Sequence, residues 1–448
     1  MAAHVDPADD GHVRSDAVTD EGAGYPNRAY AWCVVAILIG TAVLAYSDRQ
    51  VLSLLVGPIR HDLGISDGQM SLLLGTAFAV TYGIAGIPLG LLADRVSRRY
   101  LLFTGVVVWS LGTVACAFAH GLVPLFVARV VVGLGEAVLS PAAISIISDY
   151  FPPSRRGTAV GCFLSGIAAG IGASILIGGG VLRAVEAGTF AATPLAAEAP
   201  WRLVLLLIGA PGFVWALVLL LIREPARRLK ESHDTAAPGA GRTAAGTWAR
   251  VAPVYLVVAA ASFVDNAVGA WAPELLIRGF AKSAADVGIQ LGYLETPAFG
   301  GGVLIGGWLA DRFGAQGGWM RKLAVCFVAG ALIFPIAFLM NARTYDVALL
   351  SIPAYFLLSG IVTACGFSAI LDAVPNRSRG FAMGVSFFLN VAVGGGLGAP
   401  AVTAASAYVF GPAAGLGPAM SLTVAGGYAA GILALVVAFV RSGRSAAT

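Results

Sequence analysis

Charged residues are scarce in this chain of 448 residues. Asp, Glu, Lys and Arg make up 12% of it, whereas an ordinary soluble domain carries roughly 25%. Hydrophobic residues make up 58%, and the mean hydropathy is +0.83. So few charges cannot cover so much apolar surface in water, which excludes a soluble enzyme, a nucleic-acid-binding protein and a disordered chain. The composition predicts an integral membrane protein.

Cysteine is also scarce, and no nucleotide-binding loop is present. The five Cys residues lie inside apolar runs without metal-ligand spacing, so we interpret them as small packing residues. The glycine clusters at 170–172 and 394–396 follow no strand and precede no Lys-Ser or Lys-Thr pair, so they predict close helix contacts and not a phosphate site. We expect no metal, no cofactor, no nucleic-acid partner and no enzymatic activity, with an ion gradient as the driving force.

Long apolar runs, by contrast, recur along the whole chain. A transmembrane helix needs about 20 mainly apolar residues. Twelve such runs, separated by charge clusters and by Pro or Gly breaks, lie near residues 30–56, 69–93, 100–119, 122–149, 158–182, 201–222, 251–279, 285–310, 320–340, 345–374, 380–409 and 418–440. The sequence therefore predicts an all-α integral membrane protein with twelve transmembrane helices.

Polar segments divide these runs into two sets of six. Residues 1–27 hold six acids and no apolar run, which predicts a disordered tail and not a signal peptide. Residues 223–250 carry five Arg and one Lys among Pro, Gly, Ala and Thr, which predicts a linker. The predicted organisation is a cytoplasmic tail at 1–27, a six-helix bundle at 28–222, a cytoplasmic linker at 223–250, a second six-helix bundle at 251–440 and a cytoplasmic tail at 441–448.

The positive charges predict the orientation in the membrane. With both termini on one side, that side collects twenty of the 28 Lys and Arg residues and the other side collects six. The remaining two, Arg49 and Arg129, fall within or near the membrane. Because cytoplasmic loops carry the excess of Lys and Arg, both termini are predicted to be cytoplasmic. We expect a monomeric multi-pass protein of the plasma (inner) membrane.

The two halves of the chain repeat each other. Residues 90–99 read GLLADRVSRR, and residues 307–314 read GWLADRFG. A second match joins RGTAVG at 156–161 to RGFAMG at 379–384. The offsets of 217 and 223 residues predict two parallel repeats of nearly equal length.

The first of these loops resembles the signature of the major facilitator superfamily, G-x-L-A-D-R-x-G-R-R, and departs from it only at Ser97. Three stretches are similar to the Spinster group within that superfamily: YSDRQ at 46–50, RVVVGLGEA at 129–137 and SDYFP at 148–152. The related organic-anion symporters share the loop and Arg129. The Pro-containing helix-5 motif of drug/proton antiporters is absent, and GIAAGIG at 166–172 stands in its place. The resemblance implies two bundles around a central cavity, substrate bound near the midplane, and alternating access by rocking.

Three ionisable residues in the first half fall deep in the predicted membrane. Asp48 and Arg129 lie roughly 12 Å and 10 Å from the outer end of their helices, and Glu136 shares a helix face with Arg129. A permanent structural ion pair between Asp48 and Arg129 is one interpretation. The other is a proton site at which Asp48 and Glu136 titrate while Arg129 alternates its partner. Arg49 is expected to extend to the outer interface.

The second half offers fewer polar candidates. Asp265 and Glu295 are deep enough to contact substrate or protons, or to face water without a role, and Asn390 is a hydrogen-bond candidate or a packing residue. Apolar candidates for the cavity wall, which plain packing would suit equally well, are Phe78, Tyr82, Trp271 and Phe299.

The signature loop is expected to carry a latch. In the family that the loop resembles, this pattern closes the cytoplasmic side while the outside is open. The residues to which the resemblance assigns this role are Asp94, Arg95, Arg98, Arg99, Asp149 and Asp311.

These features predict a proton-coupled secondary transporter. The leading hypothesis is a Spinster-like carrier of an amphipathic lipid, sphingolipid-like or lysophospholipid-like, or of a related organic molecule, with protons and membrane lipids as its other partners. The alternative is a proton/organic-anion symporter in which Arg129 binds the substrate carboxylate. A non-transporting receptor or scaffold is a second alternative, and it leaves three buried charges unexplained.

Overall fold

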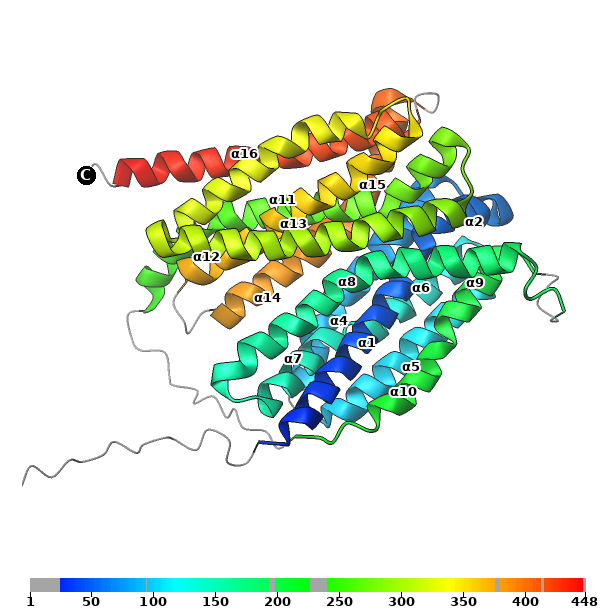
Figure 1. Cartoon of the computed structure of the whole chain (residues 1–448), viewed down its shortest axis with the longest axis horizontal. Coiled ribbons are helices and arrows are strands. Elements are labelled where there is room, and N and C mark those ends of the chain that lie inside the picture. The colour runs from blue at the N-terminus through cyan, green and yellow to red at the C-terminus, as the bar shows by residue number, and fades with distance from the viewer. Residues whose placement is uncertain are drawn as a thin grey trace, which may run out of the picture.

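In the computed structural model of the chain, residues 25–93, 95–192, 198–225, 240–374, 379–411 and 415–445 are described. The regular structure of these residues is helical throughout. Figure 1 shows long helices in two bundles, with α1 and α4 to α10 on one side and α11 to α16 on the other. The fold is therefore the predicted two-bundle, all-α architecture.

The N-terminal bundle follows the expected spans closely. Its elements are α1 (Arg28–Leu54), α2 (Val56–Leu63), α3 (Asp67–Ser71), η1 (Leu72–Thr76), α4 (Ala77–Ala93), α5 (Arg98–Ala117), α6 (Leu122–Glu136), α7 (Leu139–Tyr150), α8 (Pro153–Glu186), α9 (Pro200–Gly209) and α10 (Pro211–Leu219). A capping box starts α3, because the Ser66 hydroxyl accepts from the Gln69 N–H and the Gln69 side chain accepts from the Ser66 N–H. One continuous span then runs from α3 through the π-helical turn η1 into α4.

The C-terminal bundle consists of α11 (Ala240–Phe280), α12 (Ala284–Leu339), α13 (Tyr345–Ala373), α14 (Arg379–Leu389), η4 (Asn390–Gly395), α15 (Gly396–Ala404), η5 (Ala405–Phe410) and α16 (Leu416–Ser445). Within α12 the chain doubles back (Figure 1). Gly318 has a φ of +67° there, a conformation that glycine adopts without steric cost. The α12 segment therefore supplies two of the expected spans.

The twelve-helix prediction is confirmed. Among the described residues, ten helices are long and apolar enough to cross a membrane. The other two expected spans, 158–182 and 285–310, fall within α8 and the first part of α12. The α11 helix begins at Ala240, earlier than the predicted start of its span near residue 251. The predicted linker at 223–250 lies partly outside the described residues.

The bundles meet through glycines, and α2 and α9 lie at one end of the molecule. This end, opposite the start of α1 and the end of α16 in Figure 1, is called the distal end below. A Cβ at Gly75 would lie 2.4 Å from the Gly395 carbonyl oxygen, and one at Gly172 would lie 2.3 Å from the Thr296 hydroxyl oxygen. Only glycine allows the backbones to approach so closely. Close helix contact at both predicted glycine clusters is therefore confirmed.

Candidate transport site

A cavity of about 170 Å³ lies between the two bundles. Both halves contribute to its wall, from α1, η1, α4 and α8 on one side and from α11, α12, α13, η4 and α15 on the other. Its charged and polar lining residues are Tyr46, Arg49, Gln50, Ser53, Asp265, Asn266, Thr363 and Asn390. Aromatic rings complete the wall, so the cavity presents both apolar faces and a few fixed polar groups, as small-molecule sites do.

Arg49 is the charged group on the N-terminal wall of the cavity. Its Nη2 donates to Oε2 of Glu136 at 2.6 Å, and its guanidinium lies 3.8 Å from the centre of the Phe78 ring. Its side chain is 23% exposed, whereas that of Glu136 is 1% exposed. The prediction that Arg49 extends to the outer interface is therefore wrong. One residue along a helix turns the side chain by about 100°, which aims Arg49 at the cavity and at a carboxylate that compensates its charge.

Asp48 and Arg129 lie behind this wall, buried in the N-terminal bundle. Arg129 reaches the Asp48 backbone carbonyl and the Leu73 carbonyl, each at 3.5 Å. The two side chains form no ion pair with each other, so the prediction of a direct Asp48–Arg129 pair is wrong. Oδ1 of Asp48, Oε1 of Glu136 and Nη2 of Arg129 are buried without a hydrogen-bond partner among the described residues. The backbone thus brings four ionisable groups together but leaves several of their atoms unsatisfied.

Asp265 is the charged group on the C-terminal wall. Its Oδ1 accepts hydrogen bonds from the Tyr355 hydroxyl at 2.6 Å and from the Ser359 hydroxyl. Asn390 also lines the cavity and donates to the Ser262 hydroxyl at 2.8 Å. Glu295 is 1% exposed and is not part of the cavity wall. Of the two alternatives for Glu295, exposure to water does not fit this burial, and a contact with substrate or protons stays a prediction.

Two of the four apolar candidates, Phe78 and Phe299, lie on the cavity wall. Tyr82 lies one helical turn after Phe78 on α4, with ring centres 5.3 Å apart. Trp271 is fully buried, and its Nε1 donates to the Ala399 carbonyl at 3.1 Å. Trp271 therefore packs, which is the alternative that the sequence left open, and Tyr82 is not part of this cavity wall, because hydrophobicity alone does not distinguish a helix face that packs from one that lines a cavity.

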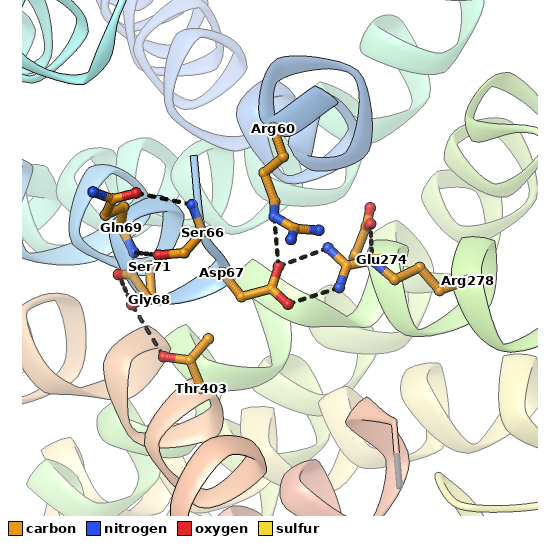
Figure 2. Close-up of polar contacts among 9 residues, drawn as sticks. All are labelled: Arg60, Ser66, Asp67, Gly68, Gln69, Ser71, Glu274, Arg278 and Thr403. Atoms are coloured by element: carbon orange, nitrogen blue, oxygen red, sulfur yellow. Dashed lines mark hydrogen bonds and ion pairs between the residues drawn. The ribbon is translucent and has the colours of Figure 1, made fainter. Parts of the chain in front are cut away.

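Ion pairs close the distal end between the bundles (Figure 2). Arg278 of α11 donates two hydrogen bonds of 2.8 Å to Asp67 of α3, and Arg60 of α2 reaches the same carboxylate at 2.9 Å. Glu274 pairs with Arg278 within α11. Thr403 of α15 donates to the Ser71 hydroxyl at 3.1 Å. The group formed by Arg60, Asp67, Glu274 and Arg278 is called the distal lock below.

Among the described residues, the ion pairs that join the two bundles lie at this distal end. Besides the distal lock, Arg183 at the end of α8 pairs with Asp286 at the start of α12. At the opposite end, Lys322 and Asp372 pair at 2.5 Å inside the C-terminal bundle. The distal end is thus held shut by charge, and the ion pairs at the other end stay within their own bundles.

The predicted latch residues are organised around Arg98, which is buried. Arg98 pairs with Asp149 and, at 2.8 Å, with Glu224, a residue that the sequence did not indicate. Arg95 and Asp311 are exposed and have no ion-pair partner among the described residues, and Asp94 lies outside them. The latch between the bundles therefore stays a prediction.

Glu224 is fixed where the chain leaves the N-terminal bundle. It accepts from the Arg99 backbone N–H at 3.0 Å, from Arg98 Nε at 2.8 Å and from the Ser97 hydroxyl at 2.8 Å. Burial raises the pKa of Glu224, but these three hydrogen bonds outweigh burial and hold the pKa below its ordinary value. Ser97, the single departure from the signature loop, therefore has a role in this structure as a ligand of Glu224.

Two packed helical bundles around a central polar and aromatic cavity define the architecture of a membrane transporter. The sequence profile of the Major Facilitator Superfamily matches residues 38–399. The chain belongs to that superfamily, and within it the chain is Spinster-like.

Two relatives match about four-fifths of the chain. It is 29% identical over 377 residues to an MFS-type efflux pump of Mycolicibacterium smegmatis, covering 82% of each chain. It is 28% identical over 372 residues to the hexuronate transporter of Bacillus subtilis, covering 80% of this chain and 83% of that protein. Among solved structures, it is similar to a bacterial homologue of the human lysosomal transporter Spinster in an inward-facing, unoccupied conformation. That likeness has a TM-score of 0.73 and 25% identity, over 92% of this chain and 96% of the other.

Proposed function

We propose that this protein is a proton-coupled secondary transporter, captured here in its inward-facing state. One observation carries the coupling proposal: the Arg49–Glu136 pair stands on the cavity wall in front of buried, unsatisfied atoms of Asp48, Glu136 and Arg129. A permanent structural pair favours satisfied polar atoms, because an orphaned buried polar atom costs about 1–3 kcal/mol. Unsatisfied acids beside two arginines suit a network that changes partners when a proton binds.

The steps follow from which groups can be neutralised. Arginine stays charged, whereas a buried carboxylate can lose its charge by taking a proton. Protonation of Glu136 would release Arg49 into the cavity, and protonation of Asp48 would change the field around Arg129. A substrate that contacts Arg49 thus competes with Glu136 for the same guanidinium. This competition links the proton to the substrate without any nucleotide.

The inward-facing assignment rests on where the bundles are tied. The distal lock and the Arg183–Asp286 pair join the bundles at one end, and the similar Spinster homologue is inward-facing. The excess of Lys and Arg at the other end supports a cytoplasmic location for the termini. Rocking of the bundles would break the distal lock and close the cytoplasmic side.

The cavity favours an amphipathic substrate. Phe78, Phe299 and Phe356 supply apolar surface, while Arg49 and Asp265 place opposite charges on facing walls. A lipid-like molecule with an apolar portion and a polar head fits these features. This is the leading substrate class.

An organic-anion symporter is the second candidate, and one observation favours it. Arg49 lines the cavity, so a carboxylate could displace Glu136 from it, and the Bacillus subtilis relative is a hexuronate transporter. The anion would bind Arg49 and not Arg129, which is 1% exposed behind the wall.

A binding screen separates the two classes. Purified protein in detergent is titrated with lysolipids, sphingoid lipids and sugar acids at an acidic and a neutral pH, and thermal stabilisation is measured. We expect a lysolipid or sphingoid lipid to stabilise the protein, with a smaller effect in Arg49→Gln. Stabilisation by a sugar acid alone, lost in Arg49→Gln, would instead establish the symporter. Binding without pH dependence in either class would contradict proton coupling.

A further inference from the structure

The C-terminal bundle contains a second group of ionisable side chains, on four different helices. Asp265 of α11 accepts from Tyr355 and Ser359 of α13. Tyr428 of α16 packs on Tyr355, with ring centres 6.2 Å apart. Glu295 of α12 lies one helical turn before Phe299, which lines the same cavity as Asp265.

This cluster differs from the N-terminal network because it contains no cation. Neither Asp265 nor Glu295 pairs with Lys, Arg or His among the residues that the structure describes. Arg49 lines the same cavity from α1, but it is engaged by Glu136. Two neighbouring acids without a cation cannot both keep a negative charge at low cost.

The hydrogen bonds decide which of the two acids keeps the charge. Both hydroxyl donors, from Tyr355 and Ser359, converge on Oδ1 of Asp265, and donors to a carboxylate favour its charged form. Glu295 is 1% exposed, and its Oε1 is buried without a hydrogen-bond partner in the described part of the chain. The Tyr428 hydroxyl is also buried and unpartnered. An unpaired acid in such surroundings is far cheaper to bury as a neutral carboxyl.

We propose that Glu295 and Asp265 form a second proton-binding site, in the C-terminal bundle, where Glu295 holds a proton that passes to the cavity through Asp265. Asp265 lies on the cavity wall and Glu295 lies behind it. The pair therefore connects a buried proton carrier to the substrate space. That this proton drives transport rests on the proposed function above, whereas the existence of the site does not.

A proton fits this cluster better than Na⁺. The Tyr355 hydroxyl donates a hydrogen bond of 2.6 Å to Oδ1 of Asp265. While this hydrogen bond is made, the two oxygens cannot coordinate the same metal ion. A metal ion would need several oxygens turned toward it and away from each other. A bound sodium ion would therefore have to break hydrogen bonds that a proton leaves intact.

Infrared spectroscopy tests the site without any substrate. Full-length protein is titrated with acid and base in a maltoside detergent, which has no carbonyl group, and the absorption of protonated carboxyl groups is followed. We expect the band to be weaker in Glu295→Gln by the absorption of one buried, protonated carboxyl group. The matched control Glu186→Gln, an exposed acid at the end of α8, should not alter the buried band. The double variant R49Q/E136Q should keep the Glu295 absorption.

Two further variants test whether the acids act together. Asp265→Asn removes the neighbouring negative charge and should shift the titration of the Glu295 band. Tyr355→Phe removes one donor to Asp265 and should shift it as well, with little effect on the fold. An unchanged band in Glu295→Gln would overturn the proposal, and so would an unmoved titration of the Glu295 band in Asp265→Asn. Loss of the band on addition of Na⁺, but not of choline, would also overturn it, because the site would then bind sodium. The double variant R49Q/E136Q leaves Glu295 in place. Loss of pH-driven transport in this variant, with the Glu295 band intact, therefore concerns only the proposed function and not the existence of the second site.

Discussion

The two bundles of this transporter handle the buried charges beside the central cavity in opposite ways. In the N-terminal bundle, two arginines stand among two acids, and the contact on the cavity wall is an ion pair of 2.6 Å between Arg49 and Glu136. In the C-terminal bundle, Asp265 accepts hydrogen bonds only from hydroxyl groups, and Oε1 of Glu295 has no partner among the described residues. Arginine cannot shed its charge, whereas an acid can. The first bundle therefore holds a charge that needs a partner, and the second holds acids that need a proton.

The largest effect should come from leaving Arg49 without its acid. Glu136→Gln strands a permanent cation, while Arg49→Gln strands an acid that can take up a proton. We expect Glu136→Gln to lower the free energy of unfolding by about 3 kcal/mol, and Arg49→Gln to lower it by clearly less. The double variant should recover part of the loss. Denaturation of the purified proteins in detergent measures all three, and equal losses in the two single variants would contradict the asymmetry.

The next effect concerns the glycine contact that joins the two bundles. Gly75→Ala places a Cβ 2.4 Å from the Gly395 carbonyl oxygen, so a backbone has to move. Overpacking of this kind costs about 1–3 kcal/mol, and it should shift the protein away from the distally closed state. Gly83→Ala is the matched control, because its Cβ meets nothing within 4 Å.

Thiol labelling measures this shift from the distal side. A cysteine at Thr403, whose hydroxyl contacts Ser71 in the closed state, should react faster with an impermeant reagent in Gly75→Ala. Its rate should stay unchanged in Gly83→Ala. Equal rates in the two variants would show that the glycine contact does not hold the bundles together.

A smaller shift in the same assay should follow from the distal lock. Asp67→Asn removes the carboxylate that bridges Arg60 and Arg278, and leaves the two cations facing each other (Figure 2). Partly exposed ion pairs contribute at most about 1 kcal/mol, so labelling at Thr403 should rise about fivefold. High salt should reduce the difference between Asp67→Asn and the unmodified protein. A difference that salt leaves untouched would argue against an electrostatic lock.

The smallest effect should appear at the opposite end of the molecule. Because the folded-state pKa of Glu224 lies below its ordinary value, its contribution to stability is complete above the ordinary pKa and is lost as the pH falls through the folded-state value. Glu224→Gln should therefore destabilise the protein by about 1 kcal/mol at neutral pH and have little effect in acid. Melting temperatures measured across this pH range test the sign. A loss that grows toward low pH would contradict it.

The sequence predicted the helices better than it predicted the site. Apolar length and charge clusters identified twelve spans, because the membrane imposes both features on every span. Side-chain partners depend on helix rotation, which hydropathy does not report. Arg49 and Asp48 are neighbours in the sequence, yet one faces the cavity and the other is buried behind it.

The distal lock and Glu224 were missed for a related reason. Asp67, Arg278 and Glu224 lie near span ends, where charged residues are common and no motif sets them apart. Their partners lie up to 211 residues away in the chain. Only the packing of the bundles brings those charges together. The capping box at Ser66 and Gln69 was a readable local signal, but it predicted where α3 begins and not which cation Asp67 meets.

We propose above that acids of the N-terminal bundle couple a proton to transport. The most direct measurement compares Asp48→Asn with the unmodified protein in reconstituted vesicles, using the ligand that the binding screen returns. Uptake is driven by an imposed pH gradient in one arm and by substrate exchange in the other. We expect Asp48→Asn still to exchange substrate but no longer to respond to the gradient. Gradient-driven uptake at the unmodified rate in Asp48→Asn would contradict it.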